Sequence, residues 1–171
     1  MTSRSNLEVF QNIVCQAELT DGTRGCIRAI RSHDEMRMRQ GIAQLSDHSR
    51  YLRFFSRQTT PSDKVIQKLI DVDGYNHMAW GAVLTHHPEN PAIGSVHAFR
   101  DDEHSQTGEL SFAIIDAYHG LGLARMLMAV LLVNCRLAAL DTLDIHVLWE
   151  NKVAVRFAKS LGGMRTNSPP E

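Results

Sequence analysis

The chain alternates between stretches with strand-like and helix-like spacing of apolar residues. Residues 7–31 read as two strands joined by a turn at Asp21-Gly22, and the second strand alternates apolar with polar positions. Helical spacing follows from Ser32, where Glu35 stands at the distance of a capping box. The first third of the chain therefore predicts a strand pair followed by helices.

Further elements are predicted along the rest of the chain. The predicted helices are 32–45, 49–55 as a short helix or turn, 60–70, 121–140 and 151–161, and the predicted strands are 76–85, 92–99, 108–115 and 143–148. Short connections make the first three of these strands an antiparallel meander. The helix over 121–140 is apolar nearly all round, so we expect it to be buried.

The order of elements predicts one mixed α/β domain over residues 1–171, of the α+β kind with helices flanking a mixed sheet. The polar ends, 1–6 and 166–171, are expected to be flexible. No internal repeat or linker divides the chain.

Charge and composition narrow the classes of function. The formal net charge is -1 and no basic run occurs, so we expect no nucleic-acid partner. No stretch of about 18 apolar residues suggests a membrane span. The three cysteines are spaced neither like zinc ligands nor like a redox pair, and the N-terminus has no signal-peptide pattern. Both observations favour a cytoplasmic location.

A glycine-containing loop connects a predicted strand to a predicted helix. Residues 109–115 lead into His119-Gly120-Leu121-Gly122-Leu123-Ala124, and the helix follows at once. The first turn of a helix offers free N–H groups and the positive end of its dipole, and glycines let phosphate oxygens approach the backbone. The alternative is a tight turn that merely starts a helix. No Gly-Lys-Ser/Thr follows, and the dinucleotide fingerprint is incomplete, so both of those phosphate-binding classes are disfavoured.

This loop resembles motif A of the GNAT superfamily of acyl-coenzyme A N-acyltransferases, Gln/Arg-x-x-Gly-x-Gly/Ala. His119 stands at the first place, Gly122 at the fourth and Ala124 at the sixth. The first place departs from the motif, although a histidine can also donate a hydrogen bond.

Other segments extend the resemblance over residues 20–163. Trp149-Glu150-Asn151, with the following helix and Leu161-Gly162, is similar to the family's second coenzyme-binding segment. Residues 45–46, 49–55 and 72–79 are similar to the GNAT domains of bacterial protein lysine acetyltransferases. The resemblance implies the GNAT fold, a mostly antiparallel sheet in which a parallel pair, 108–115 and 143–148, splays apart.

The resemblance also implies acetyl-CoA as cosubstrate. Main-chain groups of two strand residues would bond the pantetheine arm, the loop and helix start would hold the pyrophosphate, and an asparagine would bond the arm or a water. The implied cofactor-binding residues are Ile114, Ile115, His119, Gly120, Leu121, Gly122, Leu123, Ala124, Arg125 and Asn151.

Glu109 is the candidate catalytic base. A lysine amine has a pKa of about 10.4 and must be neutral to attack a thioester. Many family members place a glutamate near the start of this strand, where Glu109 shares one face with Ser111 and Ala113. The alternative is an ordinary strand-end glutamate that faces solvent.

The residue that would protonate the leaving thiolate is open. The tyrosine that many family members carry on the last helix corresponds to Ala158, and His97, His119 and His146 are candidate donors by position. His86-His87 precedes a proline turn without a supporting ligand cluster, so we predict no metal.

Two functions of different classes remain. The first is an N-acetyltransferase that moves acetyl from acetyl-CoA to a primary amine, either a protein lysine or a small-molecule amine. The second is an acyl-CoA-binding regulatory module with little or no turnover, which Ala158 favours and Glu109 disfavours. The few residues after Gly163 are too short for the family's final hairpin, so we expect residues 7–19 or a second subunit in a homodimer to cover that sheet edge.

Overall fold

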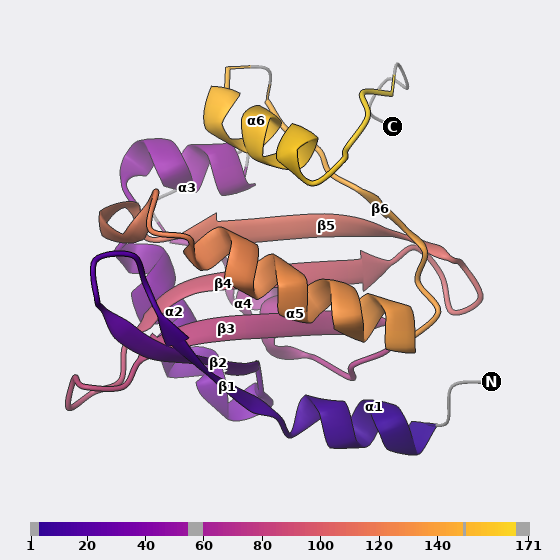
Figure 1. Cartoon of the computed structure of the whole chain (residues 1–171), viewed down its shortest axis with the longest axis horizontal. Coiled ribbons are helices and arrows are strands. Elements are labelled where there is room, and N and C mark those ends of the chain that lie inside the picture. Colours follow the sequence, from indigo (N-terminus) through magenta and orange to yellow (C-terminus); the bar gives the residue numbers. More distant parts are fainter. Residues whose placement is uncertain (1–3, 55–59, 149, 167–171) are drawn as a thin grey trace.

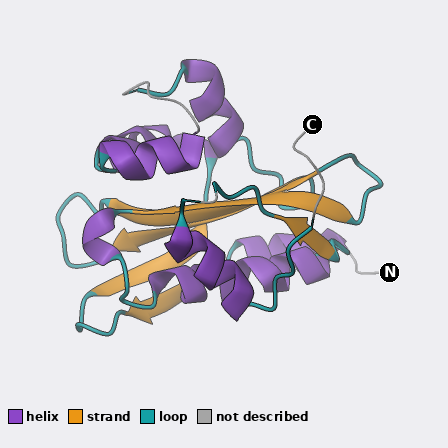
Figure 2. Ribbon diagram, turned by 90° about the horizontal axis from the view of Figure 1, so that it is seen from above, coloured by secondary structure: helices purple, strands orange, loops and turns teal. Residues whose placement is uncertain are grey.

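The computed structural model describes residues 4–54, 60–148 and 150–166. One six-stranded sheet, in the order β1-β2-β3-β4-β5-β6, lies between two layers of helices (Figures 1 and 2). The strands are β1 (Val14–Glu18), β2 (Arg24–Ala29), β3 (His77–Leu84), β4 (Ala92–Arg100), β5 (Thr107–Ile114) and β6 (Thr142–Asp144). The helices are α1 (Arg4–Gln11), η1 (Ser32–Asp34), α2 (Glu35–Ala43), α3 (Asp47–Phe54), α4 (Asp63–Ile70), η2 (Asp116–Tyr118), α5 (Leu123–Leu137) and α6 (Lys152–Ser160).

Neighbouring strands from β1 to β5 are antiparallel, and β6 runs parallel to β5. The parallel pairing covers only Thr107–Glu109 of β5, although β5 continues to Ile114. Beyond that pairing, Phe157 of α6 packs edge-on against Phe112 of β5, with ring centroids 5.4 Å apart. The mixed sheet with a short parallel pair confirms the predicted fold class, while the predicted strand 143–148 ends early, at Asp144.

Helix α5 packs across β3, β4 and β5 on one face of the sheet (Figure 1). Leu123, Leu127 and Leu131 of α5 are buried there in the same core as Trp80 of β3. The expectation that this helix is buried all round is wrong, because Leu132 and Val133 are 45% and 49% exposed. Only the side toward the sheet and α1 is covered.

Residues 7–11 form the end of helix α1 rather than a strand, and residues 4–6 form its start. Leu7 and Gln11 are both buried and stand four residues apart, which is the spacing of one face of a helix. The β-branched and aromatic residues between them favour a strand and so obscured this spacing. Gln11 donates from Nε2 to Asn134 Oδ1 of α5 at 2.6 Å. Phe10 packs edge-on against Trp80, so α1 completes the α5 layer.

Helices α2, α3 and α4 cover the opposite face (Figure 2). Ser62 caps α4, since its hydroxyl accepts from Val65 N. At the start of α2 the predicted Ser32–Glu35 capping box is wrong, because Asp34 accepts the bond from Arg31 N at 2.9 Å. A buried carboxylate with two arginine partners outcompetes the exposed serine for this position.

β1 pairs with β2 at the edge of the sheet opposite β6. The idea that residues 7–19 cover the β6 edge is therefore wrong. In the described ranges, none of the helices has both the length and the apolarity that crossing a membrane requires.

Candidate functional site

The predicted phosphate loop lies between β5 and α5. Gly120 and Gly122 have φ values of 72° and 88°, which favour glycine, and a Cβ on either would meet nothing within 4 Å. The first intrahelical bond runs from Met126 N to Gly122 O, so the N–H groups of residues 123–125 precede it. Open space in front of these donors, at the positive end of a 15-residue helix, fits a diphosphate.

Two contacts from distant segments fix this loop. Thr20 N, in the β1–β2 turn, donates to Leu121 O at 3.2 Å. The side chain of Arg125 donates to Ser160 Oγ of α6 at 3.0 Å, which ties the two helix ends together. His119 is exposed, and its Nε2 lies 2.8 Å from Ile114 O, so that nitrogen carries the proton and donates it to the strand end.

The third support is Asp116 of η2. Its carboxylate accepts from Ser49 Oγ at 2.6 Å and from Ser46 N and Oγ at 2.9 and 3.1 Å. Partial burial opposes the charge, but these hydrogen bonds lower the pKa of Asp116. The start of α3 is thereby anchored to the residues that lead into the phosphate loop.

Beyond its pairing with β6, the outer edge of β5 carries main-chain groups of alternate residues. Ile115 N donates to Ile93 O at 3.0 Å and Ile115 O accepts from Tyr118 N at 2.8 Å, so this residue faces β4 and η2. Because hydrogen-bonding direction alternates along an antiparallel strand, Ile114 and Phe112 face the outer edge. The structure brings Ile114 to this edge but not Ile115. Sequence reasoning missed Phe112, which the two-residue alternation could have revealed.

Asn151 caps helix α6. Its Oδ1 accepts from Ala154 N at 3.0 Å, while the Nδ2 end of the same amide is a donor. The amide thus begins the helix whose Phe157 packs edge-on against Phe112 of β5. Trp149, part of the same predicted segment, lies outside the described residues.

Glu109 lies on the opposite face of β5 from Phe112, as predicted, and is exposed. The register places it across from Phe99 of β4. Burial lowers the pKa of Arg53 in α3 to about 10, and the nearby Glu109 carboxylate acts against that change. A carboxylate and a guanidinium therefore stand together at the start of β5.

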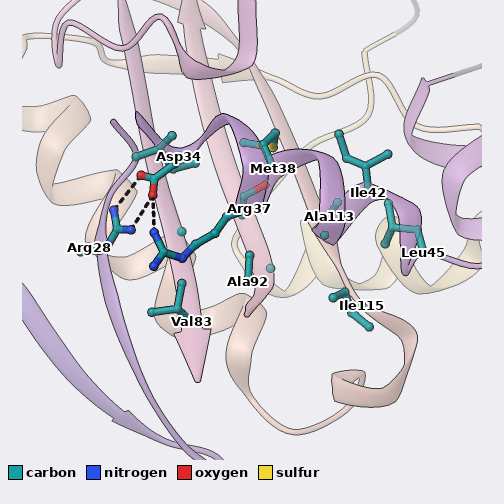
Figure 3. A pocket seen from close by; sticks show the side chains of 15 residues that line it. Arg28, Asp34, Arg37, Met38, Ile42, Leu45, Val83, Ala92, Ala113 and Ile115 are labelled. Atoms are coloured by element: carbon teal, nitrogen blue, oxygen red, sulfur yellow. Dashed lines mark hydrogen bonds and ion pairs between the residues drawn. The ribbon is translucent and has the colours of Figure 1, made fainter. Parts of the chain in front are cut away.

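A cavity of about 60 Å³ lies between α2 and the sheet, on the same face as Glu109 (Figure 3). The strands carry glycine, serine and alanine here, and these small residues leave space under the apolar side chains of α2. Its lining includes Gly81, Ser95, Ala113, Ile115, Met38, Ile42 and Leu45. Glu109 is outside the lining, so the cavity and the predicted base are separate features of one face.

One end of the cavity is charged. Arg28 and Arg37 approach Asp34 Oδ1 at 2.6 and 3.1 Å (Figure 3). Burial alone would raise the pKa of Asp34, but hydrogen bonds from Arg28, from Arg31 N and from Arg37 lower it to about 2. The cluster is therefore fixed in its ionised form at neutral pH.

The predicted proton donors are dispersed. His97 is fully buried in β4, and His146 is exposed beyond the end of β6. Ala158 offers only its carbonyl, which accepts from Gly163 N at 2.9 Å. Among the residues with described positions, no group of three or more metal-ligand side chains comes together. His87 accepts from Glu89 N in an exposed turn.

Comparison with known proteins identifies the family. Residues 24–164 match the acetyltransferase (GNAT) domain model. The chain is 34% identical over 110 residues to the acetyltransferase PA5475 of Pseudomonas aeruginosa, a match that covers 64% of this chain and 59% of the relative. The matched part thus spans less than two thirds of that relative's length.

Solved structures share the fold. The GNAT domain of S. lividans PAT superposes with a TM-score of 0.85 at 22% identity, over 92% of each chain. An aminoglycoside N-acetyltransferase in complex with CoA gives 0.64 at 15% identity, over 88% of this chain and 94% of that one. A cAMP-binding acyltransferase from Mycobacterium smegmatis gives 0.62 at 20% identity, over 98% of this chain and 50% of that one. The chain belongs to the GNAT acetyltransferase family.

Proposed function

We propose that this protein is an N-acetyltransferase that transfers acetyl from acetyl-CoA to a primary amine by direct attack. The observation that carries the proposal is the pair of left-handed glycines before α5, next to the unpaired outer edge of β5. A phosphate-binding helix start and a free strand edge are what a diphosphate with an amide-containing arm requires. The CoA complex of the aminoglycoside N-acetyltransferase supports the same cosubstrate.

The binding residues follow from this arrangement. The N–H groups of residues 121–125, with Gly120 and Gly122 beside them, hold the pyrophosphate. The main-chain groups of Phe112 and Ile114 bond the pantetheine amides, with Asn151 Nδ2 as a further donor to the arm or to a water. Acetyl-CoA then supplies a thioester whose thiolate leaves readily, since a thiol pKa is about 8.5.

Glu109 is the proposed base, acting on the amine directly or through a water. Its carboxylate also attracts a cationic acceptor to the start of β5. The thiolate takes its proton from solvent, because Ala158 has no hydroxyl to give.

The acceptor is a protein lysine or a small-molecule amine. The likeness to the GNAT domain of S. lividans PAT favours the former, and the aminoglycoside N-acetyltransferase favours the latter. A regulatory acyl-CoA-binding module is the second candidate, favoured by Ala158. We further infer a cytoplasmic enzyme, since its three cysteines are free, and a homodimer that covers the β6 edge.

Replacing Glu109 by Gln tests the proposed base. With Nα-acetyllysine amide, a lysine-containing peptide or neamine as acceptor, we expect kcat to fall roughly 100-fold. The affinity for acetyl-CoA, measured by calorimetry, should stay within about twofold, because the side chain faces away from the outer edge of β5.

Glu103→Gln is the matched control, because Glu103 is an exposed glutamate in the β4–β5 turn. An equal kcat for Glu109→Gln and wild type would make Glu109 an ordinary strand-end glutamate. Binding of acetyl-CoA without transfer to any acceptor would favour the regulatory module.

A further inference from the structure

A chain of hydrogen bonds runs through the sheet face beneath α2 and α4. His77 Nδ1 lies 2.7 Å from Asp71 O, and His77 Nε2 lies 3.0 Å from His97 Nδ1. His97 Nε2 in turn lies 3.2 Å from Ser95 Oγ. His97 is fully buried and His77 is 7% exposed, so these groups bond to one another in place of water.

The chemistry of the end group fixes the direction of every bond. Asp71 O is a carbonyl and can only accept, so His77 Nδ1 carries a proton. Neutral His77 then accepts at Nε2 from His97 Nδ1–H, and neutral His97 accepts at Nε2 from the Ser95 hydroxyl. The Ser95 proton is therefore directed inward, toward His97, while the oxygen lone pairs remain available to an outside group.

Ser95 stands where the chain meets the cavity. Its Cα partner across the strands is Ala113, and both residues line the cavity. Ala113 lies between Phe112 and Ile114, the two residues whose main-chain groups face the outer edge of β5. The serine is thus one strand, roughly 5 Å, from the strand that would carry the thioester, whereas Glu109 does not line the cavity.

We propose that Ser95, His97 and His77 form a proton relay that takes up the second proton of the acceptor amine, the one its nitrogen loses on attack, after Glu109 has taken the first from the ammonium form. This inference rests on the proposed function. The amine nitrogen attacks the thioester carbonyl carbon, the C–N bond forms, the C–S bond breaks, and the electron pair leaves on sulfur. The surplus amine proton passes, directly or through one water, to Ser95 Oγ as the Ser95 proton moves to His97 Nε2.

The remaining shift places the charge at the outer end. His97 gives its Nδ1 proton to His77 Nε2 and stays neutral, with its tautomer exchanged. His77 becomes the cation, still donating to Asp71 O, and later releases its proton to solvent. The thiolate is protonated by solvent, so each proton is accounted for.

The surroundings suit this division of charge. Burial lowers the pKa of His97 well below its ordinary value, and His77 and Arg53 disfavour a cation there further. Burial also lowers the pKa of His77, but Asp71 O and the carboxylates of Asp73 and Asp71 favour its charged form, against Lys68 of α4.

Glu109, the charged group that β5 contributes to this face, acts on Arg53. Both imidazoles are therefore neutral and ready to accept a proton near pH 7, and the cation is tolerated better at His77 than at His97.

The first test measures the imidazole tautomers of the free protein by ¹⁵N NMR near pH 7. We expect the Nδ1–H tautomer for both His77 and His97. The Nε2–H tautomer at His97 would overturn the relay, because the nitrogen facing Ser95 could not accept a proton.

The second test is kinetic and uses Ser95→Ala and His77→Gln, with Nα-acetyllysine amide and neamine as acceptors. Glutamine keeps an oxygen that accepts from His97 but cannot take up a proton, so the fold is retained. We expect kcat to fall roughly 10- to 100-fold in each variant, with the acid limb of its pH profile lost and the KM for acetyl-CoA within about twofold.

Ser111→Ala is the matched control, since it removes a hydroxyl from the residue opposite His97 without entering the chain. Suppose that Ser95→Ala and His77→Gln keep the wild-type kcat and pH profile while Glu109→Gln is impaired. That result would overturn the relay but leave the proposed function standing. Absence of transfer by the wild-type protein to either acceptor would overturn the proposed function and the relay with it.

Discussion

At the scale of single residues, Asp34 is the charged group most strongly held by its surroundings. It is 5% exposed and faces two guanidinium groups at one end of the cavity. A carboxylate with a lowered pKa stabilises the fold above the pKa of the unfolded chain, about 3.9. That stabilisation is lost as the pH falls from about 4 through the folded-state pKa of about 2.

Replacing Asp34 by Asn should therefore lower the free energy of unfolding by about 2 kcal/mol at pH 7, because two arginines lose their counter-charge. The difference from wild type should shrink between pH 4 and pH 2. Urea unfolding at several pH values measures both. The control is Asp47→Asn, whose pair with Arg50 has a carboxylate that is 93% exposed and should change stability by less than about 0.5 kcal/mol. Equal effects of the two substitutions would contradict this account of Asp34.

The residues that the sequence revealed best are those whose role depends on local backbone. Gly120 and Gly122 stood out because the segment with these glycines joins a strand directly to a helix, and both have the left-handed backbone that glycine favours. Ile114 and Ile115 were both predicted to bond the pantetheine arm, but the main chain of Ile115 bonds Ile93 and Tyr118, so of the two only Ile114 faces the outer edge of β5. The chain of Ser95, His97 and His77 depends on the register between β3 and β4, which no local pattern encodes.

At the scale of elements, Asp116 couples helix α3 to the phosphate loop. Three hydrogen bonds from Ser46 and Ser49 end on its carboxylate. Asp116→Ala should cost about 1 kcal/mol in stability, as the loss of a helix cap does, and should speed amide exchange at Ser46. Hydrogen-exchange mass spectrometry with denaturant unfolding measures both effects.

Asp102→Ala is the matched control, because Asp102 also accepts a backbone bond, from His104 N, but in the β4–β5 turn. In the control we expect faster amide exchange only in that turn. In Asp116→Ala we expect faster amide exchange only in α3. Unchanged exchange at Ser46 in Asp116→Ala would mean that the anchor is dispensable.

Elements with strong local signals were predicted well. The three strands of the meander were located within one residue of their bounds, and helix α4 begins three residues after its predicted start at residue 60. Helix α1 was missed because its stability comes from Gln11 and Phe10 docking on Asn134 and Trp80, partners more than 60 residues away. The early end of β6, at Asp144, was likewise not predicted, and beyond that pairing Phe157 of α6 packs against Phe112 of β5.

At the scale of the whole molecule, the sheet separates two tasks. The α5 face and the outer edge of β5 carry the predicted phosphate loop and the groups proposed to bind an acyl-CoA. The α2 face carries Glu109, the cavity and the buried histidines. Under the proposed function, β5 would face the cosubstrate with one face and its outer edge, and the acceptor with its other face, so the two would meet at this strand.

The most direct test of the central claim is calorimetric titration with acetyl-CoA and, separately, with free CoA. We expect wild type to bind both with a roughly micromolar Kd, and Gly122→Leu to weaken binding by about tenfold or more. Gly22→Leu is the control, since Gly22 has a φ of 85° and equally open surroundings but lies in the β1–β2 turn. Undetectable binding by wild type at millimolar ligand, or equal weakening by both substitutions, would contradict the assignment of the phosphate loop as the cosubstrate site.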